Sequence, residues 1–161
     1  MSEKLKVMQT RIQKELKSIR IVYLALIIAI TTFLTFAIVL KYIGFTGTLE
    51  GDMISFQVFQ FTSFLIGISS IGGGIYIFNK KIKALNTENL TEKILKYREA
   101  MIIRGASIEG ASLFFISAYF LFQHDFFIIA ALIGLGLLGF FFPTNSRIAK
   151  ELNIEERELK G

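Results

Sequence analysis

Two ionisable side chains, Arg104 and Glu109, interrupt the otherwise uncharged run from Met101 to Phe122. An ionised group at the centre of a membrane helix costs about 2.5–3.5 kcal/mol on insertion scales, so it persists where it is neutral, paired or wet. If a helix starts at Met101, Glu109 lies roughly 12 Å along it, close to the bilayer midplane. Glu109 could therefore bind and release a proton or cation, or remain protonated and donate an interhelical hydrogen bond.

The partners of Glu109 are left open by the sequence. Arg104 is the nearest cation, but five residues is an awkward separation on one helix, and its long side chain can reach the cytoplasmic headgroups. The other partners are hydroxyls in the two preceding apolar blocks: Thr31, Thr32, Thr35, Ser69 and Ser70. We predict an ion-binding site or a set of interhelical polar contacts formed by Glu109, Arg104, Ser69, Ser70 and Thr32.

Other chemistry finds little support in the composition. The chain has no Cys and one His, which excludes disulfides, a thiolate nucleophile and a Cys- or His-rich metal site. No nucleophile–base pair and no phosphate-binding loop is visible. We predict no enzymatic activity, no cofactor and no bound metal.

Four apolar blocks must position these residues: 21–40, 56–78, 101–122 and 126–142. A helix needs roughly 20 residues to cross about 30 Å of hydrocarbon, so the fourth block is at the short end. With 53% of the chain apolar, the predicted fold is all-α: an integral membrane four-helix bundle in which residues 1–161 form a single domain.

The basic residues predict the orientation of these spans. All but two of the 18 Lys and Arg residues precede the first block, lie in the loop 79–100 or follow the fourth block. Such a distribution places those segments in the cytoplasm, so both termini are predicted to be cytoplasmic in a bacterial inner (cytoplasmic) membrane. The net charge of +5 then reflects topology and requires no nucleic acid. The expected partners are the lipid bilayer and either a second copy or a membrane-complex subunit.

The polar segments carry helix signals of their own. Apolar residues recur at helical spacing before the first span: Leu5, Met8, Ile12, Leu16 and Ile19. This amphipathic N-terminal helix either extends the first span along the lipid headgroups or docks a partner. Asn89 followed by Glu92 predicts a helix that begins at Leu90 and runs into the third span. Pro143 marks the end of the fourth span, and a short helix is predicted in the charged tail.

Small residues predict close helix packing, because they let backbones approach where no hydrophobic effect drives association. They could serve one bundle or an oligomer. The glycines predicted to pack are Gly67, Gly72, Gly73, Gly74, Gly105, Gly110 and Gly134.

An internal repeat is also suggested, since Leu65–Asn86 aligns without gaps on Leu132–Asn153. Two repeated helical hairpins would explain this similarity. Chance likeness between two Gly-rich spans is the alternative.

Two resemblances bear on function. IGISSIGGGIYIFNKKIKAL and MIIRGASIEGASLFF resemble the Gly-rich and carboxylate-bearing halves of the ATP synthase proteolipid subunit c. That resemblance implies that Glu109 is a proton-binding carboxylate. The chain as a whole is similar to uncharacterised four-span membrane proteins of the Bacteroidetes type, through R-x-A-x-x-E-G in the third span and Pro143-Thr144 after the fourth. This second resemblance implies no known activity.

The leading functional hypothesis is a small polytopic membrane protein of structural, assembly or accessory type, in which Glu109 and Arg104 hold the helices in register. The alternative is a proton- or cation-translocating, proteolipid-like protein that uses Glu109. A third hypothesis, an apolar-ligand or lipid-binding protein, rests on the Phe-rich outer ends of the third and fourth spans.

Overall fold

The computed structural model describes residues 2–45, 53–85 and 89–160, and within these ranges the chain is helical with no β-strand. The helices are α1 (Ser2–Tyr42), α2 (Met53–Lys83), α3 (Leu90–Phe122), α4 (Asp125–Phe140), α5 (Asn145–Leu152) and α6 (Glu156–Lys160). By length and composition, α1, α2 and α3 could each cross a membrane. A fourth crossing is counted only if α4 and α5 are taken as one bent span. The prediction of an all-α fold is confirmed for the described residues, and three of the helices are long and apolar enough to cross a membrane.

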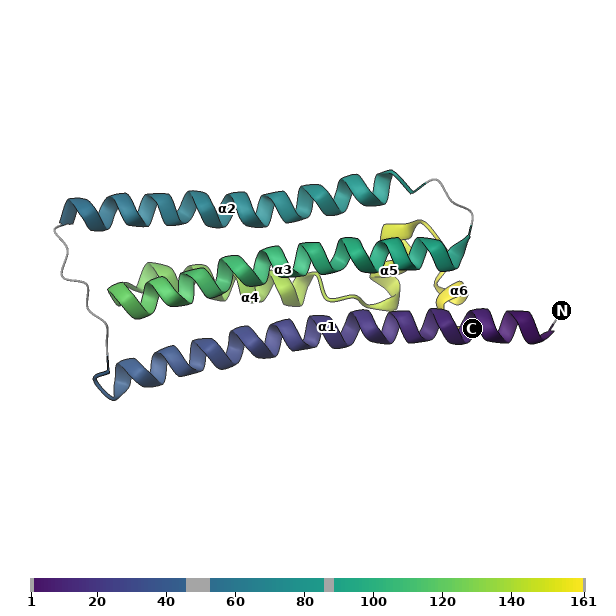
Figure 1. Ribbon diagram of the computed structural model, residues 1–161, viewed down its shortest axis with the longest axis horizontal. Coiled ribbons are helices and arrows are strands. Elements are labelled where there is room, and N and C mark those ends of the chain that lie inside the picture. The colour runs from purple at the N-terminus through teal and green to yellow at the C-terminus, as the bar shows by residue number, and fades with distance from the viewer. Residues whose placement is uncertain (1, 46–52, 86–88, 161) are drawn as a thin grey trace.

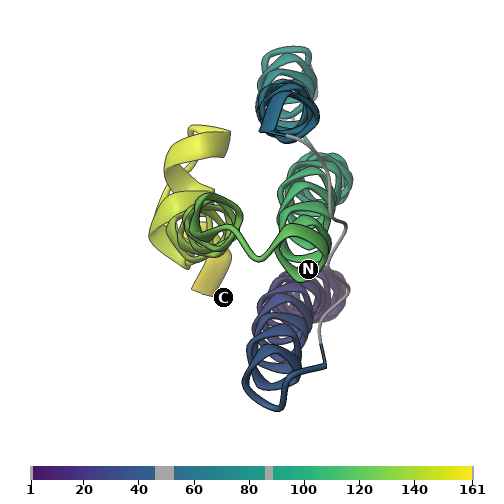
Figure 2. The ribbon, with the colours of Figure 1, turned by 90° about the vertical axis from the view of Figure 1, so that its left-hand side faces the viewer.

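The central element is α3. Figure 2 shows α2, α3 and α1 side by side in a row, with α4 on one side of that row. α3 packs against α1, α2 and α4, whereas α2 packs mainly against α3. The long helices are nearly aligned, and α5 and α6 lie at the end of the molecule where α1 begins (Figure 1). One face of α3 is therefore left without a neighbouring helix.

The predicted amphipathic segment is the first part of α1, which continues into the apolar part without a break. Its apolar side is buried at Ile12, Leu16 and Ile19, and the Gln13 side chain donates a hydrogen bond to the Leu159 carbonyl of α6. The expectation that this segment lies on lipid headgroups is wrong, because its apolar side packs within the chain instead.

The start of α3 follows from its cap. The Asn89 side chain accepts a hydrogen bond from the Thr91 N–H at 3.0 Å, and the helix begins at Leu90 as predicted. At the other end, Gln123 adopts a left-handed conformation with φ 52°. A tight connection of this kind turns the chain back, so that α4 packs against α3.

The predicted fourth span is shorter and bent. α4 has 16 residues, which corresponds to about 24 Å against roughly 30 Å of hydrocarbon. The chain then turns by 80° between α4 and α5, at a break that contains Pro143. Because Pro143 lacks an N–H and cannot continue the helix, α5 starts in a new direction.

The predicted repeat of two hairpins is not confirmed by the backbone. α2 remains helical through Lys83. The segment aligned with it is broken between Phe140 and Asn145. Residues 141–144, where this segment breaks, align with residues 74–77, which are helical within α2.

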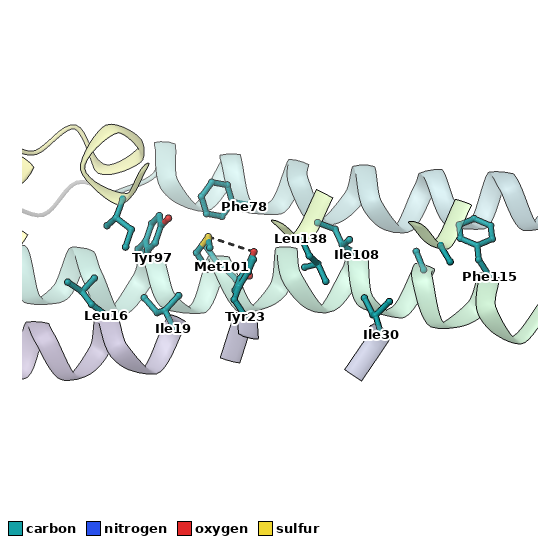
Figure 3. Close-up of a cluster of buried hydrophobic side chains, with 14 of the residues drawn as sticks. Leu16, Ile19, Tyr23, Ile30, Phe78, Tyr97, Met101, Ile108, Phe115 and Leu138 are labelled. Carbon is teal, nitrogen blue, oxygen red and sulfur yellow. Dashed lines mark hydrogen bonds between the residues drawn. The ribbon is translucent and has the colours of Figure 1, made fainter. Parts of the chain in front are cut away.

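The core follows α3 along its length. Figure 3 shows Tyr23 and Ile30 of α1, Met101 and Ile108 of α3, and Leu138 of α4 gathered around this helix. The Tyr23 hydroxyl donates to the Met101 carbonyl at 3.3 Å and lies 3.9 Å from its Sδ. These contacts hold α1 against α3.

Candidate functional site

Arg104 is sealed inside the protein. Its side chain is 2% exposed, and Nη1 lies 3.2 Å from Oε1 of Glu151 on α5. The expectation that Arg104 reaches the lipid headgroups is therefore wrong, because the guanidinium meets a carboxylate of its own chain. The guanidinium of Arg104 therefore pairs with Glu151 and not with Glu109.

The environment of this ion pair satisfies most of its polar atoms. The Tyr97 hydroxyl donates to Oε2 of Glu151 at 2.6 Å, so both carboxylate oxygens are used. The guanidinium carbon of Arg104 lies 3.7 Å from the centre of the Phe78 ring and 4.3 Å from that of Phe141. Stacking on aromatic faces favours a desolvated cation. Such a buried pair holds together only where hydrogen bonds and packing offset desolvation.

This arrangement, which we call the Arg104 cluster (Phe78, Tyr97, Arg104, Phe141 and Glu151), joins α2 and α3 to α5 and to the turn that precedes it. Sequence reasoning missed Glu151 because it is 47 residues from Arg104 in a tail that reads as exposed and charged. The available signal was spacing: Glu151 follows buried Ile148 by three residues, so both lie on the inner side of α5.

Glu109 has a different environment. Its side chain is half-buried in α3. Within the described ranges it makes no hydrogen bond or ion pair. We expected Glu109 and Arg104 together to hold the helices in register. In the structure Arg104 makes an ion pair between helices, with Glu151, and Glu109 does not. Glu109 is left with an unengaged carboxyl near the middle of a candidate span.

The predicted hydroxyl partners do not converge on Glu109. Ser70 donates across the α2–α3 contact to the Ser107 carbonyl at 3.0 Å. Thr31 donates to a carbonyl of its own helix, as does Thr35. Thr32 and Ser69 are exposed on the surface of the chain. Of the predicted polar residues, Arg104 and Ser70 make contacts between helices, and these contacts are separate.

The predicted packing glycines divide into two groups. At four of them an added Cβ would lie 2.8 Å or less from a side chain of a neighbouring helix: Gly67, Gly74, Gly105 and Gly134. At the other three a Cβ would meet nothing within 4 Å: Gly72, Gly73 and Gly110. Packing within the chain, one of the two alternatives for these glycines, is therefore not observed for this second group among the described residues.

The open side of α3 carries a groove next to α1. Its volume is about 460 Å³, and it is lined almost entirely by apolar side chains, among them Phe36 of α1 and Phe120 of α3. Residues four and seven apart share a helix face, so Glu109, Leu113 and Phe120 form one stripe that leads into this groove. We call the groove together with Glu109 and Gly110 the α1–α3 face.

The two ionisable residues can thus do different chemistry. The charge of Arg104 is neutralised by Glu151 and its side chain is shielded from solvent, as in a contact that stabilises the fold. Glu109 can be approached from outside the chain and could accept a proton, a cation or a donor from another helix. The described residues contain no group of three or more His, Asp or Glu that could hold a metal ion. Comparison of the chain with models of protein families, with curated proteins and with solved structures gave no match.

Proposed function

We propose that this chain is a small polytopic protein of the bacterial inner membrane that acts as a structural, assembly or accessory subunit by docking a transmembrane helix on its α1–α3 face. The observation that carries the proposal is the unengaged carboxyl of Glu109, half-buried in α3. Lipid tails offer no hydrogen-bond partner, and a polar group at this depth is costly when unsatisfied. A docked helix would supply the missing partner.

The proposed topology has four spans, with both termini in the cytoplasm. It is supported by the basic residues, which gather at one end of the helices and in the segments beyond it. It is also supported by the position of α5 and α6 beside the start of α1 (Figure 1). In this topology α4 serves as a short fourth span.

Two further features of the α1–α3 face support helix docking. Gly110 is exposed, and an added Cβ there would meet nothing within 4 Å. Ala106, one helical turn before it, is also exposed. Small residues spaced by four let a second backbone approach closely in a bilayer. The apolar groove beside them would receive larger side chains of the docked helix.

Disulfide cross-linking tests this proposal cleanly, because the chain contains no Cys. Gly110→Cys is compared in native membranes with Ile133→Cys, which is 59% exposed on α4. We expect a disulfide-linked species larger than the monomer for Gly110→Cys and a much lower yield for Ile133→Cys. Adding Glu109→Leu should reduce the yield, while Glu109→Gln, which retains hydrogen bonding, should preserve it. Equal yields at both positions, or none at Gly110→Cys, would overturn the proposal.

The second candidate function is proton or cation translocation by a proteolipid-like protein. The observation that favours it is that Arg104 pairs with Glu151, which leaves Glu109 without a compensating cation. A hydrophobic carbodiimide reacts in lipid with a carboxyl group that is protonated and accessible, so the extent of labelling at Glu109 reports its protonation and accessibility. Translocation predicts labelling that depends on pH and is suppressed by one cation, and loss of flux in Glu109→Gln. Labelling that neither depends on pH nor is suppressed by a cation would exclude translocation. It would leave the helix-docking proposal intact.

A further inference from the structure

A second groove lies at the bend between α4 and α5. Its volume is about 620 Å³. The Phe140 and Phe141 rings form its apolar part, while Thr144, Ser146, Arg147 and Lys150 form its polar part. We call it the elbow groove. It combines an aromatic surface with two cations and two hydroxyls.

The cations of the elbow groove are not compensated within the described residues. Glu151 also borders the groove, but its two oxygens are engaged by Arg104 and Tyr97. In the described ranges no carboxylate pairs with Arg147 or Lys150. The groove therefore presents a local positive charge that fits an anion.

The Arg147 side chain is held at the boundary between the apolar and polar parts. Its guanidinium carbon lies 4.6 Å from the centre of the Phe140 ring and 5.5 Å from that of Phe141. Arginine stacked on aromatic rings keeps its planar donors directed outward, and these donors match a phosphate in bidentate geometry. The backbone N–H of Arg147 is already bonded to the Thr144 hydroxyl oxygen at 3.3 Å.

The direction of the helices sets the level of the groove in a bilayer. α5 turns 80° away from α4, and its inner side is apolar at Ile148, Ala149 and Leu152. If α4 crosses the bilayer, α5 runs nearly parallel to the surface at the depth of the headgroups. The exposed Phe140 ring (65%) then faces acyl chains, while Lys150 lies at the level of the phosphates.

We propose that the elbow groove binds the headgroup of an anionic phospholipid of the same leaflet. Arg147 and Lys150 pair with the phosphate, the Thr144 and Ser146 hydroxyls donate to its oxygens, and the aromatic part contacts the first segments of the acyl chains. This inference rests on the four-span placement proposed above. It does not involve Glu109 or the α1–α3 face, so either proposal can fail alone.

Native mass spectrometry of the full chain in neutral detergent, with phosphatidylglycerol or phosphatidylcholine added, tests this binding. We expect phosphatidylglycerol to bind more tightly. A basic residue near a lipid surface contributes about fivefold in affinity, so Arg147→Gln/Lys150→Gln should weaken phosphatidylglycerol binding about tenfold or more. The matched control, Lys80→Gln/Lys83→Gln, removes the same charge from exposed positions at the end of α2 and should change it less than twofold.

Several outcomes would overturn the proposal. Equal losses in the two double variants would mean that the lipid responds to diffuse charge, and equal affinity for both lipids would mean that charge is not recognised. Displacement of phosphatidylglycerol by millimolar inorganic phosphate would identify a site for a soluble anion. Because Lys150 is exposed, Lys150→Gln alone should leave folding intact. An unchanged affinity in that variant would also count against the proposal.

Discussion

The substitution Glu151→Gln removes the negative charge that compensates Arg104 and changes little else in shape. The Tyr97 hydroxyl can still donate to the amide oxygen. Arg104, however, is 2% exposed and is covered by the Phe78 and Phe141 rings. It cannot reach water unless the α4–α5 turn opens. The variant therefore contains a buried cation without a counter-charge.

The size of the effect follows from this burial. Removing one partner of a buried ion pair costs about 3–5 kcal/mol, because the remaining charge stays desolvated. The ion pair between Lys81 and Glu99 provides a control, since its atoms are 3.7 Å apart and its side chains are 44% and 68% exposed. Exposed pairs contribute about 0–1 kcal/mol. Glu151→Gln should thus lower the free energy of unfolding by at least about 2 kcal/mol more than Glu99→Gln.

Reversible unfolding of the purified protein in mixed micelles, titrated with a denaturing detergent, measures this difference. Amide hydrogen exchange gives a local readout: α5 should exchange faster in Glu151→Gln, while α2 should be unaffected. The double variant Arg104→Met/Glu151→Gln should recover much of the lost stability, because it no longer buries an unpaired cation. The reasoning is refuted if Glu151→Gln and Glu99→Gln lose the same stability, or if the double variant is no more stable than Glu151→Gln.

Two further predictions use the same unfolding assay. Gly74→Ala places a Cβ 2.5 Å from the Ser107 Cβ and should cost about 1–3 kcal/mol through overpacking. The neighbouring Gly73→Ala, where a Cβ meets nothing within 4 Å, should leave stability unchanged or slightly higher. Equal effects of the two substitutions would contradict the finding that only Gly74 lies against α3. Leu16→Ala, at 1% exposure, should cost about 2–5 kcal/mol by leaving a cavity. Val7→Ala, at 66% exposure, should cost under about 0.5 kcal/mol, and a loss like that of Leu16→Ala would contradict packing of the first part of α1 within the chain.

The sequence by itself determined the features that are encoded locally. The length and composition of the apolar blocks predict the long helices, because hydrocarbon thickness sets a minimum span. The Asn89 cap predicts the start of α3. Pro143 predicts the end of the fourth span at residue 142, two residues beyond the observed end of α4 at Phe140. Each residue acts on the backbone within one helical turn. The apolar spacing before the first span likewise predicts an amphipathic segment, which the structure contains.

Only the tertiary structure decided which face of each helix is covered and which charges meet. In a span, residues that face lipid are as apolar as residues that face protein, so hydropathy does not reveal the packed side. Gly73 and Gly74 are equivalent in the sequence, yet only Gly74 approaches another helix closely. The pairing of Arg104 with Glu151 depends on an 80° turn and on a separation of 47 residues. Glu109 is left unengaged because the packing of the described helices brings no donor to its side of α3, a result that no local pattern encodes.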